Sequence, residues 1–404
     1  MTVEIRACHD DEMEQYNRVV NYVFANNDPE GIAPDAPTLP DWTTCAFVDG
    51  RLATTLGAFP FTVRLNGAPV AMGGVTQVGT LPEFRRKGLL RQVMREALGT
   101  MRDRGQSLAI LWASMGAIYQ RFGYGAASEN VSYRFDPRFA GFTRPLEESG
   151  HVSLETVDEA FPTIKQIYIQ AATPRNLHIH RATVLWQVRA FRPHPKDLRV
   201  YVAVYRNDDG EARGYAVYTT SEQPHTEPGP GHRLTVQDFA WLDLDAYRAL
   251  WEYLRRHDLV GVVDMQKVAP DDPAPALLLE PRMLNRHTSD GIWMRVTDAE
   301  RALSQRPYAA RGEITLAVAG DGICDWNNGS YLVETDGQTA AVQRTTRNPD
   351  VVMRPNALAS LIAGHSSASF LARAGLIEAP TVSALRIADE LFRTDYAPHC
   401  PDDF

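Results

Sequence analysis

The first third of the chain changes its hydrophobic period several times. Residues 10–25 carry apolar side chains at helical spacing, which predicts a helix. Short β-rich runs follow, separated by an Asp-Gly pair at 49–50 and an Asn-Gly pair at 66–67, which are typical of tight hairpins. Helical spacing returns over 89–101, with arginines on the opposite face. This pattern predicts an antiparallel meander that leads into an amphipathic helix and then a buried strand.

The rest of the chain repeats this plan once and then changes character. Between 150 and 290, strand-like runs, a helix and another strand follow each other in the order found in the first third. After residue 291, sheet-like runs precede two apolar helices. We therefore expect an α+β fold with three domains, over residues 1–145, 146–290 and 291–404.

Composition narrows the class of protein and of partner. The formal net charge of −9 argues against nucleic acid, because phosphate binding needs a basic surface. The charge suits a cationic substrate, although it also simply favours solubility. The four cysteines form no CxxC pair, and no apolar run approaches the roughly 20 residues of a membrane span. We expect a cytoplasmic protein with reduced thiols, no metal site and no membrane span.

Residues 85–88, Arg-Arg-Lys-Gly, carry the main chemical signal, because they connect a strand to a helix. Free backbone N–H groups gather at a helix N-terminus, and a glycine lets a phosphate approach them closely. Pyrophosphate is the natural guest of such a loop. On its own, however, a basic loop is more often a solvated face of the molecule.

A second element follows the loop by about 30 residues: Tyr119, then Gly123 and Tyr124. With the Arg-x-x-Gly loop, it resembles the two signatures of GNAT N-acetyltransferases, except that Leu90 stands where that family has a small residue. The segments FRRKGLLRQVM, LWASMGAIYQRFGYGAAS, AYRALWEYL and DGIWMRVTD are similar to the enhanced-intracellular-survival (Eis) family. This resemblance covers essentially the whole chain. It implies a GNAT domain, a second, degenerate GNAT-like domain and a sterol-carrier-protein-like domain.

The resemblance also implies a reaction and its cofactor, acetyl-coenzyme A. Tyr119 matches the general acid that protonates the departing thiolate, while Tyr124 is the competing candidate in a slot that usually serves packing. The α-carboxylate of Phe404 matches the base, and the alternative is a frayed terminus. The residues implied to hold the cofactor are Val78, Gly79, Thr80, Arg85, Arg86, Lys87, Gly88, Leu89, Leu90, Arg91, Ser114 and Met115.

The amine acceptor is expected near a further set of residues. By the same resemblance these are Phe24, Asn26, Asp28, Trp42, Gln77, Trp112 and Asp403, with Glu30 and Asp402 beside them. The acceptor would be an aminoglycoside-like polyamine or a lysine side chain. The resemblance further implies a homohexamer. The alternative function is a non-catalytic binding protein with a vestigial GNAT site and an apolar ligand in its last domain.

The second GNAT-like domain lacks the phosphate signal. Residues 243–247, before its helix, contain neither glycine nor a basic loop. We therefore expect this domain to act as a scaffold rather than to bind coenzyme A.

Overall fold

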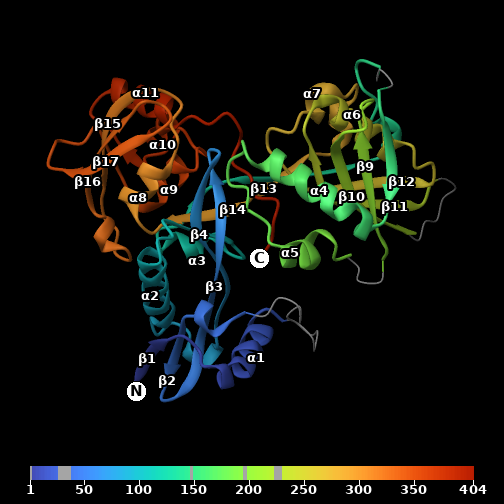
Figure 1. The fold of residues 1–404 in the computed structure, drawn as a ribbon. Helices are drawn as coiled ribbons and strands as arrows, with labels where there is room; N and C mark the ends of the chain where they lie inside the picture. Colours follow the sequence, from blue (N-terminus) through green and yellow to red (C-terminus); the bar gives the residue numbers. More distant parts are fainter. Residues whose placement is uncertain (1, 26–37, 146–148, 194–197, 223–229) are drawn as a thin grey trace. The chain divides into compact units, whose positions relative to one another are not determined.

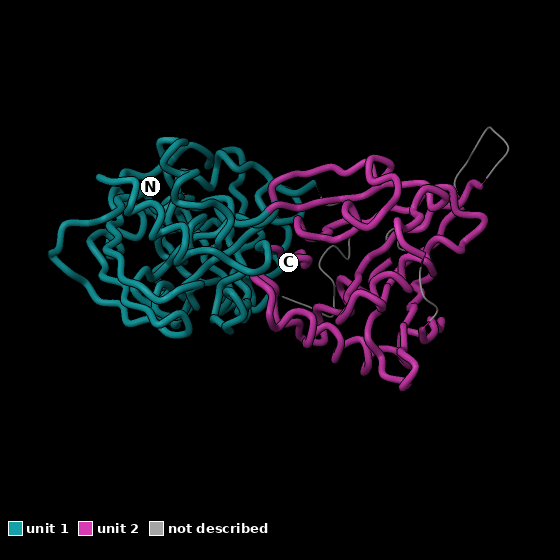
Figure 2. Tube along the Cα trace, turned by 90° about the horizontal axis from the view of Figure 1, so that it is seen from above, with its two compact units in different colours: residues 1–128, 291–398, 404 teal, residues 129–290, 399–403 magenta. Residues whose placement is uncertain are grey.

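The computed structural model describes residues 2–25, 38–145, 149–193, 198–222 and 230–404 (Figure 1). These residues form two compact units (Figure 2). Unit 1 comprises residues 1–128, 291–398 and 404, and unit 2 comprises residues 129–290 and 399–403. The last residue and the five before it therefore pack in different units.

Unit 1 contains a seven-stranded sheet. In spatial order its strands are β1 (Val3–Arg6), β2 (Cys45–Val48), β3 (Arg51–Leu65), β4 (Ala68–Thr80), β5 (Leu108–Trp112), β14 (Ile292–Val296) and β6 (Gly125–Ala126). Its helices are α1 (Met13–Val23), α2 (Leu89–Asp103) and α3 (Gly116–Gln120), with 3-10 turns at Asp10–Glu12, Pro40–Trp42 and Pro82–Phe84. The apolar stripe of α2 packs on one face of this sheet, and α1 contributes Tyr16, Val19 and Val20 to a separate core cluster.

The two hairpin turns form as the dipeptides predict. Asp49 and Gly50 have φ of 48° and 80°, and Asn66 and Gly67 have φ of 49° and 88°. Two successive residues with positive φ match the right-handed twist of the flanking strands, which is why Asp-Gly and Asn-Gly are favoured there.

Unit 1 also contains a five-stranded sheet built from the last part of the chain. Its strands, in spatial order, are β17 (Ala340–Thr345), β16 (Gly329–Thr335), β15 (Gly312–Val318), β18 (Val351–Met353) and β19 (Ile377–Glu378). Its helices are α8 (Ala299–Gln305), α9 (Pro355–Ile362), α10 (Ala368–Arg373) and α11 (Val382–Phe392), with a 3-10 turn at Asp325–Asn327.

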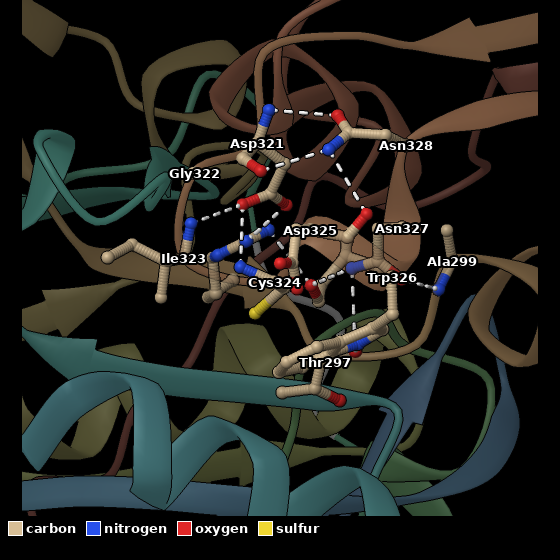
Figure 3. A network of polar contacts seen from close by, with 12 residues as sticks. Thr297, Ala299, Asp321, Gly322, Ile323, Cys324, Asp325, Trp326, Asn327 and Asn328 are labelled. Carbon is tan, nitrogen blue, oxygen red and sulfur yellow. Dashed lines mark hydrogen bonds and ion pairs between the residues drawn. The ribbon is translucent and has the colours of Figure 1, made fainter. Parts of the chain in front are cut away.

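A buried polar network fixes the loop of residues 321–328 in this part of unit 1 (Figure 3). The Asp321 carboxylate accepts hydrogen bonds from the backbone N–H groups of Ile323 and Cys324, at 3.1 and 2.8 Å, and pairs with the buried Arg295. Arg95 of α2 donates two hydrogen bonds of 3.0 Å to Asp325. The network therefore holds the loop in one conformation against α2.

Unit 2 has a single seven-stranded sheet. Its strands, in spatial order, are β13 (His287–Asp290), β7 (Glu129–Phe135), β12 (Val260–Val268), β11 (His232–Trp241), β10 (Ala212–Glu222), β9 (Val200–Arg206) and β8 (His151–Glu155). Its helices are α4 (Val157–Ala172), α5 (Thr183–Leu185), α6 (Leu244–Arg255) and α7 (Ala274–Leu277), with a π-helical turn at Trp186–Ala190 and 3-10 turns at Pro137–Phe139 and Pro281–Leu284. Two core clusters, one against α4 and one against α6, cover this sheet.

The strands next to the expected domain boundaries take part in distant pairings. β14 lies between β5 and β6 of the first sheet, and β7 lies between β13 and β12 of the second. The boundaries at 145 and 290 stay a prediction. Any domain division has to allow β14, which follows residue 290, to pair with β5 and β6 of the first sheet.

None of the helices in the described residues is long and apolar enough to cross a membrane. Within the same residues, no group of His, Cys, Asp and Glu has the arrangement of a metal site. The four cysteines are free and buried.

Candidate active site

The first sheet opens between two neighbouring parallel strands. β4 pairs with β5 only where Met72–Gly74 face Leu108–Ile110, although β4 continues to Thr80. Beyond Gly74 the two strands have no ladder pairing, so main-chain groups of residues 75–80 lack a partner in β5. The register therefore shows an opening between β4 and β5 just before the basic loop.

A β-bulge in β4 shapes the same opening. The register with β3 passes from Gly57–Thr76 to Thr55–Gly79, so two residues of β4, Gln77 and Val78, oppose one residue of β3. Gln77 has φ of 54°, a conformation that non-glycine residues seldom adopt. Tyr16 and Thr38 donate hydrogen bonds of 2.8 and 3.0 Å to its side-chain oxygen. Gln77, expected at the substrate, is therefore held by contacts that stabilise the bulge.

The loop after β4 ends at a helix whose first turn is open. Gly88 directly precedes α2 with φ of 80°, and no atom lies within 4 Å of the position that a Cβ would take there. Arg86 also has positive φ, at 63°. The first N–H groups of a helix have no partner inside the helix, so this loop presents donors at the positive end of the α2 dipole. The arrangement can bind an anion.

The basic side chains near this loop divide into two groups. Arg85 Nε donates to the carbonyl of Thr80 at 2.9 Å, and Arg91 Nη2 donates to the carbonyl of Gly322 at 3.0 Å. Arg86 and Lys87 are exposed, and the Lys87 ammonium lies 5.3 Å from the Phe84 ring centroid. Arg85 and Arg91 thus shape the loop, whereas Arg86 and Lys87 are the cations best placed to meet an anion from solvent.

The remaining cofactor candidates lie on both sides of the opening. Val78, Gly79 and Thr80 end β4, while Ser114 and the 61% exposed Met115 follow β5. Leu89 is buried in the α2 core, and Leu90 is half-buried against it. The bulky Leu90 therefore points partly into the protein rather than into the loop.

The two candidate tyrosines differ in what their hydroxyls contact. Tyr124 is fully buried, and its hydroxyl faces Met94 Sδ at 3.8 Å. Tyr119, on α3, is 7% exposed, and within the described residues its hydroxyl has no hydrogen bond. Burial raises the pKa of Tyr119, so the phenol stays protonated at neutral pH. The rings meet edge to face at 5.8 Å. Tyr124 therefore supports Tyr119, whose proton is available.

Phe404 lies on β4 at the point where the strands diverge. Thr76 Oγ1 donates a hydrogen bond of 3.1 Å to a carboxyl oxygen of Phe404. The Phe404 ring packs edge to face on Phe61, with centroids 5.2 Å apart. A Cβ at Gly74 would lie 2.4 Å from the Phe61 ring and 3.1 Å from the Phe404 ring, so only glycine leaves room there. The structure thus orders a terminus that the sequence alone would leave frayed.

An aromatic row leads away from Phe404 along β3. Edge-to-face pairs connect Phe404 to Phe61, Phe61 to Phe59 at 6.0 Å, and Phe59 to Trp42 at 5.6 Å. This places the expected substrate residue Trp42 on the same row as the terminus. Trp112 ends β5 and is half-buried.

The other expected substrate residues in the described part of the chain have contacts of their own. Phe24, 51% exposed, follows the last residue of α1. Asp403 pairs with Lys267 of unit 2, and Asp402 is buried in unit 2, where Arg181 Nε donates to it at 2.8 Å. Asn26, Asp28 and Glu30 lie outside the described residues.

Two residues of the site were not expected from the sequence. Thr76 and Phe61 hold Phe404 together with Gly74, which the sequence marked only as a glycine that permits distortion of the strand. The available signal was the period of two along β4, because residues 74 and 76 share a face of the strand. That signal shows the face but not that the chain terminus returns to it.

Family models match three successive parts of the chain. An acetyltransferase (GNAT) domain matches residues 4–127, another acetyltransferase (GNAT) domain matches residues 177–296, and a sterol carrier protein domain matches residues 299–401. The expected α+β class, with two GNAT parts followed by a sterol-carrier-protein-like part, is confirmed.

Relatives and solved structures match this chain over nearly its whole length. An uncharacterized N-acetyltransferase of Streptomyces griseus is 29% identical and covers 100% of both chains. The N-acetyltransferase Eis of Mycobacterium tuberculosis is 28% identical over 90% of this chain and 91% of its own. The crystal structure of Eis1 from Mycobacterium abscessus superimposes with a TM-score of 0.85 at 27% identity, covering 99% of this chain and 100% of the other.

A fourth match shows the fold alone. The structure of a GCN5-related N-acetyltransferase from Anabaena variabilis has a TM-score of 0.87 at 18% identity, over 100% of both chains.

The open strand pair, the glycine loop and these matches together define an enzyme class: the chain is an N-acetyltransferase of the GNAT type. Within that class it is similar to Eis proteins over nearly the whole chain, as the resemblance of its segments indicated.

Proposed function

We propose that the chain transfers an acetyl group from acetyl-coenzyme A to an amine by direct attack on the thioester, with Phe404 as base and Tyr119 as acid. The observation that carries this proposal is the Phe404 carboxyl group on β4, hydrogen-bonded to Thr76 where β4 and β5 diverge. Packing of the Phe404 ring does not by itself require a hydrogen bond to the carboxylate, so the ordered carboxylate supports a chemical role.

The opening between β4 and β5 fits the proposed cofactor. Main-chain groups of Val78, Gly79 and Thr80 suit the amides of pantetheine, and the open first turn of α2 suits pyrophosphate. Arg86 and Lys87 add exposed positive charge at that end. Acetyl-coenzyme A supplies the activated acyl group, and the chain's own residues hold it and move protons.

Two proton movements remain for the protein. The Phe404 carboxylate accepts a proton from the attacking amine, directly or through water. Tyr119 donates its phenolic proton to the departing thiolate. Burial raises the pKa of Tyr119, so the phenol is protonated at neutral pH, and a thiolate that forms in the same desolvated place also gains proton affinity.

The acceptor proposed is a compound with several amines. The aromatic row from Trp42 to Phe404 can bind ammonium groups through cation–π contacts. A chain of net charge −9 concentrates cations. Aminoglycoside-like polyamines and lysine side chains both fit, in a cytoplasmic homohexamer as the resemblance suggests.

A transfer assay with and without Phe404 tests the proposal. We expect the full-length chain to acetylate members of a polyamine panel, and deletion of Phe404 to lower kcat by at least about 100-fold, the usual range for loss of a general base. Binding of acetyl-coenzyme A, measured by calorimetry, should change little. Full turnover after the deletion would remove Phe404 as the base, and failure of the intact chain to bind acetyl-coenzyme A would favour a non-catalytic binding protein.

A further inference from the structure

The sheet of unit 2 opens in the same way as the first sheet. Its parallel pair, β11 and β12, is in register from His232–Val260 to Val236–Met265, and β11 then continues to Trp241 without β12. This is the position that the β4–β5 opening occupies in the first sheet, because a parallel pair lies at the middle of each.

The C-terminal tail, residues 399–403, packs beside this second opening and lines a pocket there. A pocket of about 100 Å³ is lined by β11, by the end of β12 and by His399 and Pro401 of the tail. His399 N–H donates to the Asn176 carbonyl at 3.0 Å, and Asp403 pairs with Lys267 of β12. Cys400 is 1% exposed. The tail is therefore packed as core, unlike most chain ends.

A buried ionic cluster holds the tail at Asp402. Arg181 donates from Nε to Asp402 at 2.8 Å, and from Nη1 and Nη2 to Asp238 of β11 at 2.6 and 3.0 Å. Tyr168 donates to Asp402 at 3.3 Å, and Tyr215 donates to Asp238 at 2.7 Å. We call these five residues the Arg181 cluster.

Burying the charged groups of this cluster costs desolvation free energy, and the contacts that offset this cost hold the tail in place. Arg181 and Asp402 are 4% and 3% exposed, and a buried ion pair recovers its desolvation cost only with good geometry. Arg181 uses three donor nitrogens on two carboxylates, and its guanidinium carbon lies 3.9 Å from the Tyr168 ring centroid. Apolar residues of similar volume would often stabilise the core as well, so the charges point to specific placement.

We propose that Arg181 is a positioning residue for acetyl transfer: it fixes Asp402, and through Asp402 the Phe404 carboxylate two residues later. Two residues of extended chain span about 7 Å at most, so the carboxylate stays within that distance of the anchored Asp402. Unit 2 contributes to the reaction by holding the tail beside an opening that takes no cofactor. This inference rests on the proposed role of Phe404.

The experiment uses Asp402→Asn, which keeps the shape of the side chain and removes its charge. We expect kcat to fall at least tenfold while the Kd for acetyl-coenzyme A changes less than twofold. A carboxypeptidase should release Phe404 at least tenfold faster than from the parent chain. The matched control is Arg213→Gln, which removes an ion pair with Asp243 in the same unit but away from the tail.

A double-variant comparison separates positioning from general stability. In a chain that lacks Phe404, Asp402→Asn should lower kcat no further, because Arg181 and Asp402 act only through Phe404. An equal loss of kcat with and without Phe404 would overturn the proposal. If the Phe404 deletion is itself without effect, the assignment of the base fails; if only Asp402→Asn is without effect, the positioning role alone fails.

A second variant protects the test against misfolding. Lys267→Gln removes the ion-pair partner of Asp403 and leaves all five residues of the Arg181 cluster in place. We expect a smaller change, about threefold, in both kcat and Phe404 release, again absent without Phe404. Unchanged release from both folded variants would contradict the anchoring.

Discussion

The two GNAT-like sheets share an opening beside a parallel strand pair but use it differently. In the first, β4 and β5 part after Gly74 and Ile110, and the loop that follows has a glycine and exposed cations. In the second, β11 and β12 part after Val236 and Met265, and the chain's own tail lines a pocket there. The same strand geometry therefore has a glycine loop beside it in one sheet and the tail beside it in the other.

The start of the following helix shows why only one opening can receive pyrophosphate. Gly88 leaves the first turn of α2 uncapped. At α6, Asp243 accepts a hydrogen bond of 2.9 Å from the N–H of Ala246 and another of 2.8 Å from Arg213 Nε. A carboxylate at the position where a phosphate would bind both satisfies the helix donors and repels an anion. The residue at the N-cap is thus one difference between the two openings, and the tail beside the second opening is another.

The largest expected effect comes from giving the first helix the cap of the second. Gly88→Asp should weaken acetyl-coenzyme A binding by on the order of 100-fold, because a carboxylate repels pyrophosphate and the φ of 80° strains any side chain. Gly210→Asp is the matched control, since Gly210 also has φ of 80° with open space around it. Calorimetry measures the affinity of both variants for acetyl-coenzyme A. An equal loss of affinity would contradict the role proposed for the open first turn of α2.

Exchanging the two tyrosines for phenylalanine separates acid from support. Tyr119→Phe should lower kcat by about 10- to 100-fold with little change in cofactor affinity. Tyr124→Phe loses only the contact to Met94 Sδ and should cost about 1 kcal/mol of stability with kcat near the parent value. The reverse order of kcat values would make Tyr124 the acid.

Filling the space beside the terminus should have an intermediate effect. Gly74→Ala places a methyl group 2.4 Å from the Phe61 ring, so Phe61 and Phe404 must move and kcat should fall about tenfold. Gly73→Ala, on the other face, places a methyl group 2.6 Å from the buried Met101 side chain and contacts neither Phe61 nor Phe404, so it serves as the crowding control in the same steady-state assay. Equal rates for the two variants would show that the Phe404 ring need not be fixed.

The tail in unit 2 should respond to acid through His399. Burial, helped by Arg175, lowers the pKa of His399 to about 3. Unfolded histidine titrates near 6.5, so the unfolded chain binds more protons between these values and stability falls as pH falls below about 6.5.

A His399→Leu variant isolates this term, because Asp402, whose pKa burial raises, and His178, whose pKa burial lowers, remain in both chains. The stability of the parent relative to the variant should decrease by about 2 kcal/mol from pH 7 to pH 5. Thermal unfolding at both pH values measures this difference, and a constant difference would mean that His399 titrates normally.

The smallest expected effect is the reverse exchange in unit 2. Asp243→Ala removes the N-cap of α6 and should cost about 1 kcal/mol of stability. It should confer no acetyl-coenzyme A binding, because the tail still packs beside the opening. Measurable binding by calorimetry would show that the cap alone excludes the cofactor.

Local signals were the part of the fold that could be predicted. The Asp49-Gly50 and Asn66-Gly67 turns, the helix after Gly88 and the buried strand at Leu108–Trp112 depend on neighbouring residues only. The return of β14 to a position between β5 and β6 could not be read in this way, because strand pairing over such separations leaves no local pattern.

The candidate site also has a part that local sequence signals predicted and a part that depends on distant contacts. The glycine loop and Tyr119 were found from motifs, and the role of Phe404 came from resemblance alone. Thr76, Phe61 and Gly74, which hold Phe404, come from β3 and β4, more than 300 residues earlier in the chain. Asp402, which was expected near the substrate, is buried beside Arg181. From the sequence alone, an aspartate this close to a chain end is expected to be exposed. The burial of Asp402 depends on Arg181, which is distant in the sequence.

The sequence by itself determined where the chain turns, where α2 begins and which loop attracts an anion, because these depend on φ preferences, capping and charge within a few residues. The tertiary structure alone decided that the tail packs beside one opening and that the terminal carboxyl group reaches β4. Those outcomes depend on which distant groups meet, and burial sets their charge and position only after they have met.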